Sequence, residues 1–210
     1  MERTTNIEEV KLLFGNNFIG AEELSSVSNC FPLHIPNKIP EIPFSEQQLS
    51  NAKDDYLLIL GVTQMHHTNP ITLMSLRNFF GIDPDIYEPC FYNQDWYIKE
   101  NFMNKSLECK WYLLRKNVFE DSRSVQPSQL ERQYTFPLAI LCAYTFFVYW
   151  FLYKDILWKY DFIWCNDMDH NGDRIYVGKY HDIDGINKNG FSIHRHLGLR
   201  NCYGAINTIN

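Results

Sequence analysis

The stretch NDMDHNGDRIYVGKY, residues 166–180, spaces its oxygen-bearing side chains as a calcium-binding loop does. Asp167, Asp169 and Asn171 stand at positions 1, 3 and 5 of such a loop, and a glycine follows at position 6. Position 12 is Gly178 instead of the glutamate that supplies two oxygens. We therefore expect, at most, a weak site for a divalent cation at these three side chains.

The same residues also predict a β-hairpin. Asn171 and Gly172 supply the positive φ angles that a tight turn demands, and RIYVGKY after them has the pattern of a strand. In this interpretation Asp167 and Asp169 accept backbone N–H groups around the turn. Because a strand follows where a calcium-binding hand has its second helix, we favour the hairpin over the cation site.

The segment FSIHRHL, residues 191–197, is a second candidate. On a strand, His194 and His196 project to one face about 7 Å apart, with Arg195 between them. Two imidazoles with a third ligand would hold zinc or iron, whereas the cationic edge suits a phosphate or carboxylate. A polar strand face is the simplest interpretation, and anion binding comes second. Candidates for the third ligand are His170, His181 and Asp182.

A third candidate resembles the metal-and-lysine set of the PD-(D/E)xK nucleases. It consists of Asp95 and the Glu108-x-Lys110 pair at the start of an apolar strand. In that family two carboxylates hold magnesium and the lysine steadies the attacking water. Gln94 stands where the family has proline, and alternating charges on an edge strand also protect against aggregation. These three residues are the candidates for catalysis.

Charge and motif content argue against several common classes of function. The net charge of −6 argues against a protein whose main task is to coat nucleic acid. The sequence contains no nucleotide-binding glycine loop, nucleophile elbow, C-x-x-C or H-E-x-x-H motif. We expect a non-catalytic domain that recognises a protein or an anionic ligand, with a metal-dependent phosphoesterase or nuclease as the alternative. The candidate contact residues are Arg174, Lys179, His194, Arg195 and His196.

A long apolar run must supply the core that positions these side chains. FPLAILCAYTFFVYWFLY, residues 136–153, approaches the length of a membrane span. Its tyrosines and tryptophan are spread along the run, whereas membrane spans concentrate such residues at the two interfaces. We expect a buried central helix, with a membrane anchor as the alternative.

Shorter elements are predicted around this helix. Capping residues predict helices after Asn6 and Ser45, and YLLILGV predicts a strand that is buried on both faces. A helix is expected from Pro70 to Phe80 and a strand from Cys109 to Phe119. The order of these helices and strands along the chain indicates a single α+β domain, in which the apolar helix packs against short, mainly antiparallel strands and C-terminal hairpins.

Four prolines divide the chain. Pro32, Pro36, Pro40 and Pro43 exclude a regular helix and predict an extended arm on the domain surface. We therefore expect an N-terminal helix with a proline-rich arm over residues 1–44 and the α+β domain over 45–210. The six cysteines are widely spaced and no signal peptide is recognisable, which favours reduced thiols and a cytoplasmic location.

The block CNDMDHNGDRIYVGKY, with the apolar helix before it and GINKNG behind it, resembles a group of uncharacterised bacterial proteins. Those proteins carry a D-x-(D/N)-x-G-x-R-x-Y-V-G-type stretch near their C-termini. The similarity extends to DWYIKENF and WYLLRK and covers the last half of the chain. The resemblance implies a soluble bacterial protein and assigns no catalytic residue.

Overall fold

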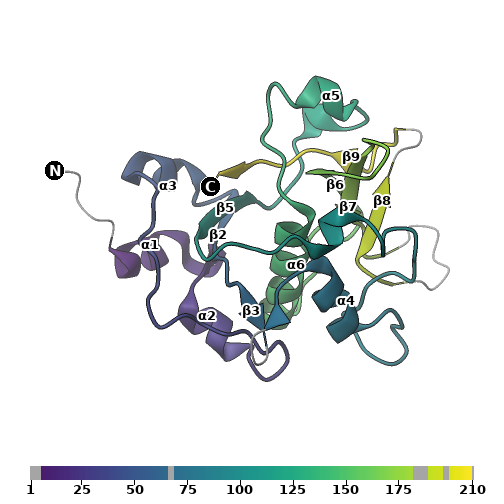
Figure 1. Cartoon of the computed structure of the whole chain (residues 1–210). Coiled ribbons are helices and arrows are strands. Elements are labelled where there is room, and N and C mark those ends of the chain that lie inside the picture. Colours follow the sequence, from purple (N-terminus) through teal and green to yellow (C-terminus); the bar gives the residue numbers. More distant parts are fainter. Residues whose placement is uncertain (1–5, 66–68, 182–188, 196–198, 210) are drawn as a thin grey trace.

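Helix α6 (Ala139–Tyr153) lies at the centre of the fold, with one four-stranded sheet on each side of it in the view of Figure 1. The computed structural model describes residues 6–65, 69–181, 189–195 and 199–209. Residues 139–148 are all buried, as expected of a helix that is apolar on every side. The helix begins three residues after the predicted start, because Leu138 is the N-cap and Pro137 precedes it. None of the described helices is long and apolar enough to cross a membrane.

The first sheet joins both ends of the chain. Its strand order is β1-β2-β5-β10, with β1 parallel to β2 and the other pairs antiparallel. The predicted strand at YLLILGV is confirmed as β2, and β1 adds a strand from the first 44 residues to the same sheet. The bounds are β1 (Phe18–Ile19), β2 (Tyr56–Leu60), β5 (Trp111–Arg115) and β10 (Thr208–Ile209).

The second sheet contains the C-terminal hairpins. Its order is β8-β7-β6-β9, and β6 and β7 form the hairpin predicted from residues 166–180. Gly172 at the tip has the expected positive φ, 85°, whereas Asn171 does not share it, so the glycine alone supplies the left-handed conformation of the turn. The bounds are β6 (Phe162–Met168), β7 (Arg174–Gly178), β8 (Ser192–Arg195) and β9 (Tyr203–Gly204). A separate two-stranded ribbon pairs β3 (Gln64–Met65) with β4 (Asn69–Pro70).

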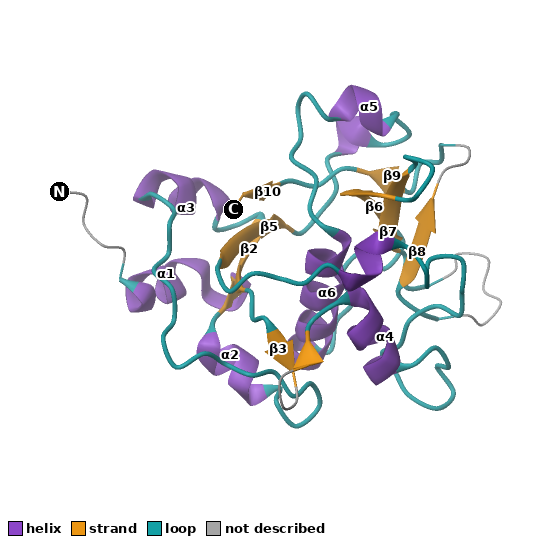
Figure 2. Cartoon of the chain, viewed as in Figure 1, coloured by secondary structure: helices purple, strands orange, loops and turns teal. Residues whose placement is uncertain are grey.

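Short helices cover the remaining surface, and loops connect them (Figure 2). The predicted caps are present, since Asn6 accepts a hydrogen bond from Glu8 N and Ser45 accepts one from Gln48 N. The predicted helix at Pro70 begins instead at Leu73, because Thr72 is its N-cap. The bounds are α1 (Ile7–Phe14), α2 (Ala21–Ser26), α3 (Glu46–Ala52), α4 (Leu73–Phe80) and α5 (Pro127–Leu130), with 3-10 turns at Gly15–Asn17, Asn101–Asn104 and Glu120–Ser122.

The proline-rich arm packs against the domain. Leu33, Ile42 and Phe44 are buried in the core, and Trp111 Nε1 on β5 donates a hydrogen bond to the carbonyl of Pro40 at 2.9 Å. The arm thereby covers apolar side chains of the first sheet. Helices and mainly antiparallel strands in one compact domain confirm the predicted α+β class.

Candidate functional site

The tip of the β6–β7 hairpin lies against the segment that precedes β5 and carries a group of charged side chains. In the described part of the chain, one set of three potential metal ligands comes together, from Glu100, Asp169 and His170. One ligand atom from each lies within 4.8 Å of the other two. Both carboxylates are buried and the imidazole is exposed. Glu100 is therefore brought to the hairpin from a position about 70 residues earlier.

Glu100 positions His170 through both of its oxygens. Its Oε1 lies 2.6 Å from the ring Nδ1 of His170, and its Oε2 accepts the backbone N–H of the same residue at 3.0 Å. The side chain of Glu100 is 7% exposed and that of His170 is 65% exposed. The buried carboxylate thus fixes an imidazole whose outer side faces solvent.

Asp169 performs the turn role expected from the sequence. Its Oδ1 accepts the backbone N–H groups of Asn171 and Asp173, each at 2.9 Å. Its Oδ2 accepts a hydrogen bond from Arg195 Nη1 at 2.6 Å. Burial acts to raise the pKa of Asp169, but the hydrogen bonds from Arg195 and from the turn outweigh it and hold the pKa below its ordinary value.

Arg195 on β8 places a positive charge between the two carboxylates. Its Nη1 is 2.6 Å from Asp169 Oδ2 and 4.0 Å from Glu100 Oε1. The guanidinium carbon lies 4.7 Å from the centroid of the Trp96 ring, a distance typical of a cation–π contact. Trp96 is fixed in turn, because its Nε1 donates to Ile193 O on β8. The Arg195 guanidinium therefore balances part of the negative charge of the two carboxylates.

Asp167 serves a different purpose. Its side chain is 2% exposed, and its Oδ2 accepts the N–H of Ala139 at 2.7 Å, in the first turn of α6. Its Oδ1 forms an ion pair with Lys105. A carboxylate at this position stabilises a helix N-terminus, where backbone N–H groups lack partners within the helix. Asp167 is thus tied to α6, and Asn171 contributes its backbone N–H to the turn.

The basic side chains expected to form a contact surface make internal contacts. Arg174 donates to Cys165 O, pairs with Glu131 and lies over the Phe136 ring. Lys179 lies over the Phe162 ring, and His194 stacks on Tyr176. Arg195 is paired with Asp169 as described above. His196 and Asp182 lie outside the described residues, and the ring of His181 contacts the side-chain oxygen of Asn189.

The three residues of the nuclease-like set form two separate surface contacts. Asp95 pairs with Arg77 at 2.9 Å, and Glu108 pairs with Lys110 at 2.6 Å. Among the described residues, neither Asp95 nor Glu108 belongs to a set of three potential metal ligands. The structure therefore places the candidate metal ligands at the hairpin tip.

In comparisons with known proteins, no family model, no curated protein and no solved structure matches the chain.

Proposed function

We propose that the chain is a non-catalytic binding protein whose hairpin tip takes a divalent cation at Glu100, Asp169 and His170. The observation that supports this function is the convergence of the three ligand atoms within 4.8 Å of one another. Two carboxylates and an imidazole suit zinc, manganese or iron, whereas calcium prefers a larger set of oxygen ligands. A cation here joins the hairpin to the segment around Glu100.

Arg195 determines how strongly the cation binds. Its guanidinium lies between Glu100 and Asp169 and neutralises part of their charge, so an incoming cation must compete with it for Asp169 Oδ2. Replacing Arg195 by methionine removes the competitor and leaves two buried carboxylates without a nearby arginine. We therefore expect Arg195→Met to bind the cation about tenfold more tightly than the wild-type chain, the effect of removing one competing ion pair.

Calorimetric titration with Mn²⁺ and Zn²⁺ tests this proposal. The His170→Ala variant is expected to lose at least about tenfold in affinity, because one of three ligands is gone. The variant also removes the ring partner of the buried Glu100 carboxylate, so circular dichroism is used to check that it folds. Glu108→Gln is a suitable control, since it removes an exposed carboxylate remote from the three ligands. Equal affinity in the wild-type chain and His170→Ala, or weaker binding by Arg195→Met, would refute the site.

We propose that the anionic ligand expected from the sequence binds beside this cation. Once displaced from Asp169, Arg195 would remain next to the metal on the face of Trp96, and together they would offer two positive charges to a phosphate or carboxylate. We expect inorganic phosphate to bind in the presence of Mn²⁺ and to bind much more weakly after Arg195→Met.

Metal-dependent phosphoester hydrolysis is the second candidate. The observation that favours it is the exposed position of His170, which leaves the outer side of a bound cation open to water and substrate. Hydrolysis of bis(p-nitrophenyl) phosphate with Mn²⁺, abolished in His170→Ala and retained in Glu108→Gln, would favour this activity over binding alone.

A further inference from the structure

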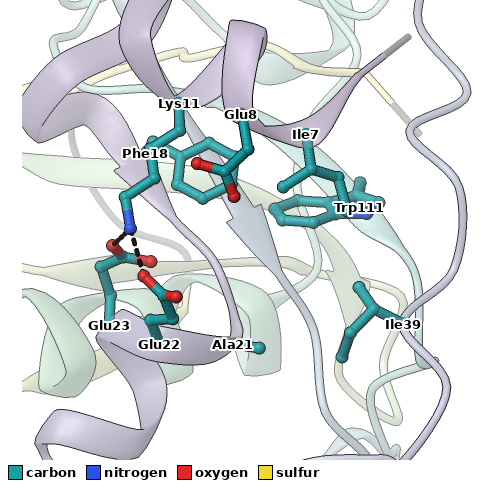
Figure 3. A pocket seen from close by; sticks show the side chains of 9 residues that line it. All are labelled: Ile7, Glu8, Lys11, Phe18, Ala21, Glu22, Glu23, Ile39 and Trp111. Carbon is teal, nitrogen blue, oxygen red and sulfur yellow. Dashed lines mark hydrogen bonds and ion pairs between the residues drawn. The ribbon is translucent and has the colours of Figure 1, made fainter.

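At the opposite end of the molecule from the hairpins (Figure 1), α1, α2, the proline-rich arm and β5 line a pocket of about 170 Å³ (Figure 3). Its apolar lining comes from Phe18 and Trp111, whose ring centroids are 5.3 Å apart, together with Ile7, Ala21 and Ile39. Both rings are buried in the core, so they form a fixed floor. A fixed apolar floor of this kind suits the binding of the apolar part of a small ligand.

The rim of the pocket is acidic. Glu8, Glu22 and Glu23 line it with a single basic residue, Lys11. Lys11 Nζ lies 2.5 Å from Glu22 and 2.8 Å from Glu23, so one ammonium group is shared between two carboxylates. Glu8 lines the same pocket as Phe18 and Trp111, and its carboxylate overlaps the Phe18 ring in the view of Figure 3. Three carboxylates against one ammonium leave the rim with net negative charge.

We propose that this pocket binds a small organic cation, an ammonium group carried on a short apolar body. The apolar body would lie on Phe18 and Trp111, and the ammonium group would lie near Glu8 and Glu22. Aromatic faces and carboxylates both attract a cation, whereas the same rim repels an anion of equal size. The pocket is bounded by two helices and the arm, so it fits one small molecule. This inference is independent of the proposed cation at the hairpin tip.

Amide NMR titration of the full chain with 3-methylbutylamine and with its neutral counterpart 3-methylbutan-1-ol tests the proposal. We expect the amine to shift the signals of Phe18 and Ala21 and to bind about fivefold more tightly than the alcohol, because only the amine carries the charge. Ala21→Leu fills the pocket and should abolish the shifts from both compounds.

A pair of variants in the first turn of α1 isolates the charge at the rim. Glu8→Gln should weaken amine binding about two- to fivefold and leave alcohol binding unchanged. Glu9→Gln makes the same change of charge one residue away, at a position that does not line the pocket. It should leave the affinities for the amine and for the alcohol unchanged. Equal affinity for amine and alcohol, absence of amine binding, or equal effects of the two variants would overturn the proposal.

Discussion

His194 links the stability of the protein to pH. Burial of the ring against Tyr176 and Phe162, with a smaller contribution from the nearby Lys179 charge, lowers the pKa of His194 to about 4 from an ordinary value of 6.5. The unfolded chain binds a proton at this residue more readily than the folded protein does. The stability that the folded protein gains while His194 is neutral is therefore complete above pH 6.5, and it is lost as the pH falls from 6.5 towards 4.

Urea denaturation at pH 7 and pH 4.5 tests this dependence. The lowered pKa of His194 predicts that this residue alone reduces the free energy of unfolding by about 2 kcal/mol between these pH values. In His194→Gln that part of the loss should disappear. Asp169 adds little in this range, because its lowered pKa affects stability only near and below pH 4. An identical pH dependence in the variant would contradict the account.

At the scale of single residues, the sequence predicted local roles better than distant partners. Asn171 and Gly172 predicted the turn, and Asp169 accepts the backbone N–H groups expected of it. Glu100 was not among the predicted ligands, because nothing in DWYIKENF distinguishes it from other acidic residues. Its burial depends on packing against a hairpin about 70 residues later, and no local pattern encodes that contact.

Among the elements, α6 depends most on aromatic packing. Phe147 is fully buried, and its ring stacks on Phe80 of α4 with centroids 4.0 Å apart. We expect Phe147→Ala to lower the free energy of unfolding by about 3–5 kcal/mol, because the truncation leaves a cavity between two helices.

Chemical denaturation followed by circular dichroism measures this loss. Leu12→Ala on α1 is the control, because the Leu12 side chain is 85% exposed and its truncation should change stability by no more than about 0.5 kcal/mol. A cost below about 1 kcal/mol for Phe147→Ala would mean that α6 is not the packed centre of the fold.

Element boundaries followed capping chemistry more closely than apolar patterns. Asn6 and Ser45 were predicted as caps and act as such. The strand predicted from Cys109 to Phe119 is shorter, from Trp111 to Arg115. The pairing of β1 with β2 and of β10 with β5 was not predictable, because strands of two residues have no periodic pattern.

At the scale of the whole molecule, the hairpin tip joins parts of the chain that are distant in sequence. Asp167 ties β6 to the first turn of α6, and Glu100 ties the segment before β5 to the hairpin. A cation that binds only the folded arrangement adds stability by mass action, about 2.7 kcal/mol at a free concentration one hundred times its dissociation constant. The proposed site would therefore stabilise the whole fold as well as the hairpin.

Anomalous X-ray diffraction from crystals grown with Mn²⁺ tests the central claim most directly. We predict a peak of anomalous density between Glu100, Asp169 and His170, at about 2.0–2.2 Å from one atom of each. Arg195 should have moved away from Asp169, and the contact between Glu100 Oε1 and His170 Nδ1 should have opened. A peak at another place, or no peak while Arg195 still pairs with Asp169, would contradict the claim.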